Sequence, residues 1–423
     1  MSVRTVVAGL VLACVTSCTI AQVAVRARVL HTMSAPGTGR LDNAVVVITD
    51  GKVAAVGPAS STPIPEGYRV IDAPVATPGL IDARCTIGVS GLLNQRQDQD
   101  QLETSGAMQP ELRAIDAFNP LDPLVAYARS LGMTTIHTGH APGELVSGQT
   151  AVIKTTGEPV ELSTLVETAA VAATIGPGAQ RGGGAPGTRA KAIAMLRDEL
   201  IRARERVRKA ARDAEPKADA TPDPDSATPA AKADERTRNL REEVMDRVVR
   251  REVPLLITCN RAQDIDAALR VAREFEIRVV LDGAAEAPLR TDEIKAAGVP
   301  VLIHPTMARA YGELENQSWE TAGVLAKAGI PVAIQGGYES YVPKARMAIF
   351  EAAVAAAHGL GFEGALAAVT RDAAAILGIG DRVGSIRVGM DGDLALFDAD
   401  PFEYRTKCVG VVIDGRVYDD TPR

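Results

Sequence analysis

The hydrophobic pattern of the chain begins with short alternating stretches that predict β-hairpins. Residues 23–30 alternate in part with polar residues, and 44–57 contain two apolar stretches joined by Asp50-Gly51. An Asp-Gly pair between two such stretches is typical of a tight hairpin turn. Residues 409–418 repeat this arrangement around Asp414-Gly415. We therefore expect antiparallel strand pairs near both ends of the chain.

The middle of the chain alternates between apolar runs and helical patterns. Buried strands are indicated by continuous apolar runs at 254–259, 277–283, 300–305 and 331–337, because strands covered on both faces need no polar side. Earlier, Asn119-Pro120 predicts a helix start, with Asn as the N-cap, and the helix is expected to run through Ser130. A strand over 133–139 and a short one around 150–154 follow. Strand-helix-strand units of this kind favour a parallel α/β fold.

A charged segment at about 181–250 interrupts this alternation. It opens with a glycine-rich joint at 181–187 and then carries two predicted helices, whose apolar stripes consist of Ile193, Leu196, Leu200 and Val207, and of Leu240, Val244 and Val248. Residues 215–234 contain no large apolar side chain, so burial cannot offset the entropy of ordering them and we expect disorder. We interpret the segment as an inserted helical hairpin, which is either a solvated insertion or a surface for partner contact.

The N-terminal residues 1–21 have the pattern of a secretory signal peptide. Arg4 precedes an apolar run over 6–15 that is too short to span a membrane. Residues 15–18 resemble a bacterial lipoprotein box, in which Cys18 would carry the lipid, whereas 19–21 resemble an ordinary cleavage site. The alternative is a buried N-terminal strand. We expect an exported protein, periplasmic or otherwise extracytoplasmic, that contacts a membrane only through a lipid at Cys18.

Composition narrows the classes of function. The net charge of -7 over 423 residues argues against general nucleic-acid binding, and an aromatic content of 3% argues against a stacking platform for bases or sugars. After the signal region, the cysteines are Cys85, Cys259 and Cys408, which is too few for a disulfide framework. Neither a nucleotide-binding glycine fingerprint nor a Gly-x-Ser-x-Gly elbow is present. We expect a small-molecule ligand or substrate as the partner.

The stretch Pro78-Gly79-Leu80-Ile81-Asp82-Ala83-Arg84-Cys85-Thr86 resembles the first barrel strand of the amidohydrolase superfamily, which usually has Pro-Gly-Leu-Ile-Asp-x-His-x-His there. Residues 370–378 and 383–398 resemble its barrel exit and return strand, and the chain looks most like imidazolonepropionase-type and related members. The resemblance implies a (β/α)8 TIM barrel over 77–382, with the insertion outside it. It also implies a small β-sandwich made from 22–76 and 383–423.

The resemblance further implies zinc-dependent hydrolysis of a non-peptide C-N bond, of the cyclic amide type. In this chain, however, Arg84 and Thr86 stand in the first two histidine positions and Thr258 in the third. Gly283 and Gly337 occupy two further ligand positions, the last of which shifts to Gln335 or Glu339 if the register slips. A guanidinium offers no lone pair to a metal and repels a cation. We therefore predict no resident zinc and no other cofactor.

The candidate ligand-binding residues are those expected at the carboxyl ends of barrel strands, where barrel enzymes place their sites: Asp82, Arg84, Thr86, His137, Thr258 and His304. Two functions stay open, namely the hydrolysis implied by the family and a metal-free barrel that binds a small anionic ligand through Arg84. Alternatively, Arg84 forms an internal salt bridge to Asp82 or another acid. His137 and His140, with Glu144 nearby, are expected to form hydrogen bonds rather than a metal site. We expect Lys154 to be solvated or salt-bridged.

Overall fold

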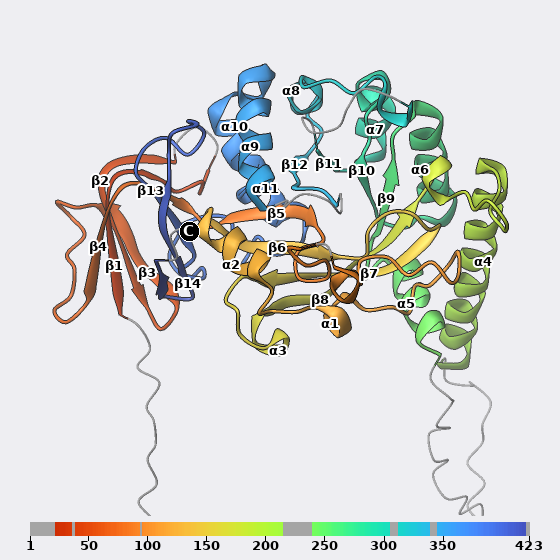
Figure 1. The fold of residues 1–423 in the computed structure, drawn as a ribbon, viewed down its shortest axis with the longest axis horizontal. Coiled ribbons are helices and arrows are strands. Elements are labelled where there is room, and N and C mark those ends of the chain that lie inside the picture. Colours follow the sequence, from red (N-terminus) through yellow and green to blue (C-terminus); the bar gives the residue numbers. More distant parts are fainter. Residues whose placement is uncertain are drawn as a thin grey trace, which may run out of the picture.

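The computed structural model describes residues 22–35, 39–93, 95–214, 239–304, 312–338 and 345–419. They form two units that lie next to each other along the long axis of the molecule, a smaller β-rich unit and a larger α/β unit (Figure 1). The predicted signal peptide, the predicted disordered stretch at 215–234 and Glu339 lie outside the described residues.

The smaller unit is built from both ends of the chain, as the resemblance implied. Its sheet has the order β15-β14-β13-β4-β1-β2-β3. The N-terminal part supplies β1 (Val23–His31), β2 (Arg40–Thr49), β3 (Lys52–Pro58) and β4 (Arg69–Pro78), and the C-terminal part supplies β13 (Leu394–Phe397), β14 (Cys408–Ile413) and β15 (Arg416–Tyr418). The two parts join where β4 pairs with β13 in antiparallel fashion.

Both predicted hairpin turns are confirmed. Asp50 and Gly51 have φ values of 52° and 75°, and Asp414 and Gly415 have values of 48° and 74°. Positive φ at both central residues is the geometry that joins two twisted antiparallel strands with a two-residue loop. The strands form one continuous sheet, which a bridge between Lys52 and Asp391 closes further, around a core of its own that includes Val25, Val46, Leu394 and Val412.

The larger unit contains the predicted barrel, an eight-stranded sheet in the order β12-β11-β10-β9-β8-β7-β6-β5. A bridge between Cys85 and Gly337 brings its two edges together. The strands are β5 (Leu80–Cys85), β6 (Met133–Gly139), β7 (Val146–Lys154), β8 (Thr164–Thr174), β9 (Leu255–Cys259), β10 (Val279–Gly283), β11 (Val301–Ile303) and β12 (Val332–Ile334). The C-terminal ends of the parallel strands therefore meet at one mouth.

One strand departs from a regular (β/α)8 barrel, because β7 runs antiparallel to both of its neighbours, β6 and β8. The connections on either side of β7 are short, and only antiparallel strands can be joined without a long crossover. The sequence predicted the second half of β7 but missed β8. The central residues of β8 are Glu-Thr-Ala-Ala-Val-Ala-Ala, and alanine and glutamate are depleted in strands, so the local signal is weak.

Helices α6 to α11 lie along one side of the barrel (Figure 1). Their bounds are α6 (Ala262–Phe275), α7 (Thr291–Ala297), α8 (Thr321–Lys327), α9 (Ala345–Ala355), which continues into a π-helical turn (Ala356–Leu360), α10 (Gly361–Ala368) and α11 (Arg371–Ile376). The short helices α1 (Ala114–Ala117) and α3 (Val160–Ser163) and the two-turn helix α2 (Pro123–Ser130) precede them. No helix in the described part of the chain is long and apolar enough to cross a membrane.

The predicted start of α2 was wrong by three residues. The N-cap is Asp122, whose Oδ1 accepts a hydrogen bond from Leu124 N over 2.7 Å, and Pro123 takes the first helical position. Asn119 Oδ1 instead accepts from Leu121 N at 3.0 Å. Two consecutive Asx-Pro pairs offered the same signal, and the second one begins the helix.

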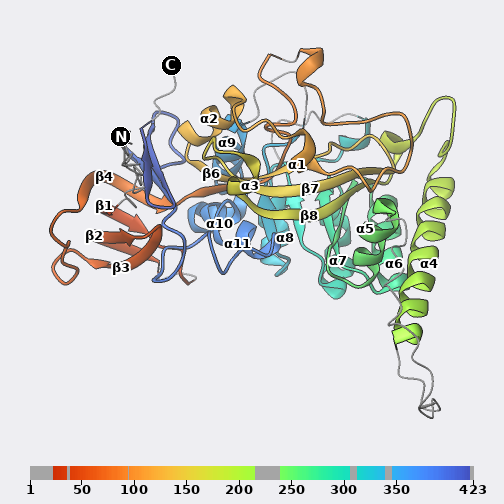
Figure 2. The ribbon, with the colours of Figure 1, turned by 90° about the horizontal axis from the view of Figure 1, so that it is seen from below.

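The insertion contains α4 (Arg189–Ala214) and α5 (Leu240–Val249), which pack side by side (Figure 2). Ile193, Leu196 and Leu200 of α4 are buried in the main core together with Val244 and Val248 of α5. Two residues depart from the predicted stripes: Leu240 is 55% exposed at the start of α5, and Val207 of α4 is only partly buried. The apolar sides of both helices are thus part of the barrel's core.

Candidate functional site

A cavity of about 330 Å³ opens at the mouth of the barrel. Its wall includes Thr174 at the end of β8, Thr258 on β9 and Gly283 at the end of β10. His304 and Tyr338, which follow β11 and β12, complete the strand-end contributions, and Asn260, Glu313 and Gln317 add polar groups. We call this space the mouth cavity. It lies where barrel folds place their ligand sites.

Arg84 lies in the interior of the barrel and is 1% exposed. Its Nη2 donates a hydrogen bond to the backbone oxygen of His140, but Nε and Nη1 are buried without a hydrogen-bond partner. Asp282, Tyr338 and Asp82 act on it electrostatically, yet no described carboxylate forms an ion pair with it. The internal salt bridge that the sequence left open is therefore not formed within the described residues.

Asp82 lies on β5, the strand that also carries Arg84, and is completely buried. Its Oδ1 accepts hydrogen bonds from the backbone N-H of Arg84 at 3.1 Å and of Gly336 at 2.8 Å, whereas Oδ2 has no hydrogen-bond partner. Burial raises the pKa of Asp82 from 3.8 to about 7, although the two backbone hydrogen bonds and Arg84 act in the opposite direction. Asp82 is thus a carboxyl group that takes up and releases a proton near neutral pH.

Asp282 connects the mouth cavity to Arg84. Thr258, in the cavity wall, donates to Asp282 Oδ2 over 2.5 Å, and Gln335 Nε2 donates to Asp282 Oδ1 over 2.5 Å. Burial raises the pKa of Asp282, and Arg84 opposes that shift. The sequence interpretation missed Asp282, although a charged residue near the end of the apolar run 277–283 was a usable signal.

His137, predicted at the pocket, does not line the mouth cavity. Its Nδ1 lies 2.7 Å from the backbone oxygen of Ala83 and its Nε2 lies 2.7 Å from Thr150 Oγ1, so both ring nitrogens are engaged. Burial, with a smaller contribution from Arg84, lowers the pKa of His137 to about 3. His137 is therefore a neutral, hydrogen-bonded core histidine, in line with the hydrogen-bonding role that the sequence favoured.

The remaining candidates divide between the cavity and its surroundings. His304 lines the mouth cavity, and its Nε2 lies 3.6 Å from Glu351 Oε1. Thr86 is buried and exchanges a hydrogen bond of 2.9 Å with Ser90, so it does not reach the cavity. His140, which burial and Arg84 hold at a pKa of about 4, has no hydrogen-bond partner on either ring nitrogen.

The donor groups at the mouth do not fit the zinc that the family resemblance implied. Within the described ranges, no group of three or more His, Cys, Asp or Glu side chains is arranged to hold a metal ion. A side chain at Gly337 would begin 3.0 Å from His304 Cε1, so the family's aspartate would require the histidine to move. Gln335, the alternative at that strand end, is committed to Asp282.

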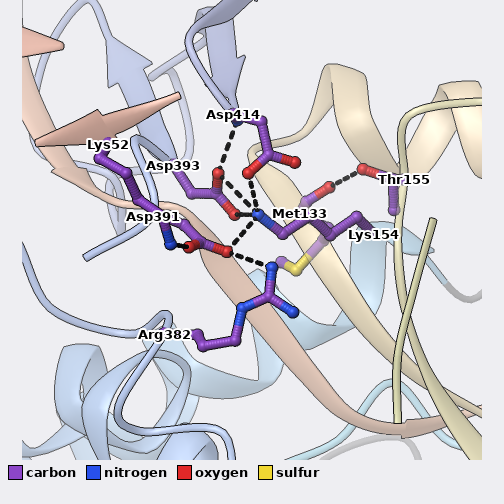
Figure 3. A network of polar contacts seen from close by, with 8 residues as sticks. All are labelled: Lys52, Met133, Lys154, Thr155, Arg382, Asp391, Asp393 and Asp414. Atoms are coloured by element: carbon purple, nitrogen blue, oxygen red, sulfur yellow. Dashed lines mark hydrogen bonds and ion pairs between the residues drawn. The ribbon is translucent and has the colours of Figure 1, made fainter. Parts of the chain in front are cut away.

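Lys154 is buried in a polar network away from the mouth (Figure 3). Its Nζ lies 2.7 Å from Asp391 Oδ2, 2.9 Å from Asp393 Oδ2 and 2.6 Å from Asp414 Oδ1. Lys52 and Arg382 also pair with Asp391. The salt-bridged interpretation of Lys154 is confirmed and the solvated one is wrong. The network joins β7 of the barrel to the C-terminal strands of the β-rich unit.

Comparisons with known proteins agree with the fold. The model of the Amidohydrolase family matches residues 335–419. The chain is 28% identical over 392 residues to the amidohydrolase tasK of Hapsidospora irregularis; the match covers 86% of this chain but 38% of that relative, so this chain spans well under half of the relative's length.

Among solved structures, an amidohydrolase from Thermotoga maritima MSB8 is 25% identical, with a TM-score of 0.83 over 94% of this chain and 99% of the other. A molinate hydrolase is 16% identical, with a TM-score of 0.56 over 94% and 95% of the two chains, which is a likeness of fold alone.

The class of protein follows from the barrel, from the β-rich unit made of both chain ends and from these similarities. The chain belongs to the amidohydrolase superfamily. Hydrolases are found among its structural neighbours. The narrower resemblance to imidazolonepropionase-type members stays a prediction.

Proposed function

We propose that this chain binds a small anionic molecule, such as a carboxylate, at the barrel mouth without a metal ion. The observation that carries the proposal is Arg84, a buried guanidinium in the position of a metal-ligating histidine, with Nε and Nη1 unpaired. A buried charged group without its hydrogen bonds costs several kcal/mol. An anion with two oxygens complements the guanidinium fork and removes that cost.

The surroundings of Arg84 support this chemistry. Thr258, which donates to Asp282, belongs to the cavity wall, and Asp282 and Tyr338 are among the groups that act electrostatically on Arg84. Arg84 is not itself part of the cavity wall, but it interacts electrostatically with Tyr338 of the wall and with Asp282, which Thr258 of the wall bonds. Because protonation of Asp82 near neutral pH removes one negative charge beside Arg84, the site gains affinity for an anion as the pH falls through about 7.

The second candidate is hydrolysis of a non-peptide C-N bond, which the similarity to the Thermotoga maritima amidohydrolase over 94% of the chain favours. Metal-activated water needs about three protein ligands, and the described residues do not provide them. Asp82, with its pKa of about 7 and a free oxygen, is the described group best suited to accept a proton from water.

A thermal-shift screen with acetate, succinate and benzoate tests the binding proposal. Carboxylates should raise the melting temperature of the wild type, and Arg84→Met should abolish the increase. Arg129→Met is the matched control, because Arg129 is also buried but bonds Thr155 O at 2.6 Å and stacks over Tyr418, away from the mouth. Equal shifts in the wild type and Arg84→Met would remove the proposal. Stoichiometric zinc with chelator-sensitive amide hydrolysis would instead establish the second candidate.

We further propose that the protein is exported through residues 1–21, on the strength of the apolar run over 6–15 and the small residues after it. Mass spectrometry of the N-terminus after expression in a bacterial host distinguishes the two processing routes. A lipidated Cys18 in the membrane fraction supports the lipoprotein route, and a free N-terminus after Ala21 supports the soluble one. An intact Met1 in the cytoplasmic fraction would contradict export.

A further inference from the structure

A second cavity, of about 630 Å³, adjoins the mouth cavity. Gly143 belongs to the walls of both, so the two spaces meet at this residue. The remaining wall of the second cavity includes Thr104, Glu144 and Arg181. We call this space the side cavity. The two cavities are therefore neighbours on either side of Gly143.

Gly143 is suited to this junction because no other residue fits there without rearrangement. Its φ is +146°, and an added Cβ would lie 2.5 Å from Leu102 Cδ2. Its backbone N-H donates to Thr174 Oγ1 at 3.2 Å, and Thr174 is itself part of the mouth cavity. The backbone between the two cavities is therefore held in place, and it runs too close to Leu102 to carry a side chain.

Glu144 brings an incompletely satisfied carboxylate to the side cavity. The residue is 4% exposed, and its Oε2 has no hydrogen-bond partner. Arg181 Nη1 lies 3.7 Å from that oxygen, which is close enough for attraction but too long for a hydrogen bond. Arg181 Nη2 donates to the backbone oxygen of Thr104 instead. Burial also raises the pKa of Glu144. The carboxylate thus lacks a close donor.

We propose that the ligand is an amino-carboxylate, whose carboxylate binds at Arg84 and whose ammonium group binds Glu144 in the side cavity. This inference rests on the proposed function for its carboxylate end. An ammonium group has three hydrogen-bond donors and a positive charge. It can donate the hydrogen bond that Glu144 Oε2 lacks, and it brings a positive charge closer to that oxygen than Arg181 does. The two groups then select a bipolar molecule over a simple anion.

Matched pairs of ligands test the ammonium subsite. Dissociation constants are measured for glycine, β-alanine, 4-aminobutanoate and 6-aminohexanoate and for their N-acetyl forms. At least one amino form should bind the wild type more tightly than its N-acetyl form, and Glu144→Gln should weaken it by about tenfold or more, the loss of one charge-assisted hydrogen bond. Glu103→Gln, which changes an exposed acid in the segment between β5 and α1, should keep the preference.

Arg181→Gln provides a second variant that leaves Glu144 in place. Removing the competing cation should strengthen binding of the amino forms, and this variant changes a side chain that is 28% exposed, so it should fold. Equal affinity of amino and N-acetyl forms in the wild type would overturn the inference, as would a preference that survives Glu144→Gln.

Butylamine separates this inference from the proposed function. If no carboxylate binds but butylamine binds and Glu144→Gln abolishes its binding, the anion site at Arg84 fails and the ammonium subsite alone is supported. If carboxylates bind in an Arg84-dependent manner without any preference for an amino group, the anion site holds and the amino-carboxylate is refuted. Absence of binding by any of these probes would refute both.

Discussion

The hydroxyl of Thr258 donates a hydrogen bond to Asp282 Oδ2 over 2.5 Å, and this contact connects the wall of the mouth cavity to the charges inside the barrel. Thr258 stands where the family resemblance expects a metal-ligating histidine, and Asp282 is one of the acids that face Arg84. The interior that would otherwise surround a metal ion is thus organised around a fixed cation, two buried acids and neutral hydrogen-bonding side chains.

Thr258→Val should destabilise the protein by about 1–3 kcal/mol, because Asp282 Oδ2 loses a buried donor. Chemical denaturation measures the change. The control is Thr134→Val, since the Thr134 hydroxyl is buried without a partner and its removal should be neutral or stabilising. Equal losses in both variants would show that the hydroxyl of Thr258 contributes no specific hydrogen bond.

Asp82→Asn should stabilise the protein more at about pH 8 than at about pH 5. The pKa of Asp82 is about 7 in the folded state, and its ordinary value of 3.8 applies to the unfolded state. Between these two values the unfolded state has already lost the proton that the folded state still holds. The free-energy cost of burying this carboxyl group therefore grows as the pH rises from 3.8 to about 7. Asparagine keeps the acceptor for the N-H groups of Arg84 and Gly336 and never ionises. A stability difference between variant and wild type that does not change with pH would contradict this assignment.

Lys154→Met should destabilise the protein by about 3–5 kcal/mol, since it leaves Asp391 and Asp393 buried without their shared central cation. Lys52→Met offers a matched comparison. Lys52 also pairs with Asp391, but its side chain is 51% exposed, so its loss should cost about 1 kcal/mol or less. Similar costs for both lysines, measured by chemical denaturation, would show that burial of Lys154 gives the network no special role.

Much of the fold could be predicted from local signals in the sequence. The Asp-Gly turns, the apolar runs of β9 to β12 and the stripe of Ile193, Leu196 and Leu200 follow from short-range rules of backbone geometry and periodicity. Strand β8 and the reversed direction of β7 could not be predicted in this way. The formation of β8 depends on pairing with strands that include one distant in sequence, and the direction of β7 depends on the length of its connections. Neither can be read from the residues of the strand itself.

The candidate site could be predicted only in part. The position of Arg84 on a barrel strand identified it as an interior cation. Thr258 and His304 line the mouth cavity, and their role as ligand-binding residues stays a prediction. Asp282 was missed, because the comparison with the family directed attention to the neighbouring Gly283. His137 and Thr86 were expected at the pocket, but their hydrogen bonds to Thr150 and Ser90 hold them beside it. The hydrogen-bond partner of a buried polar side chain depends on three-dimensional packing.

The central claim is that Arg84 replaces a metal ion as the positive group of the barrel. Isothermal titration of a carboxylate into protein treated with a strong chelator, alongside metal analysis of the untreated protein, tests it most directly. We predict no stoichiometric zinc, the same affinity before and after chelation, and a loss of about tenfold or more in Arg84→Met. Stoichiometric zinc, with binding that disappears on chelation and survives in Arg84→Met, would contradict the claim.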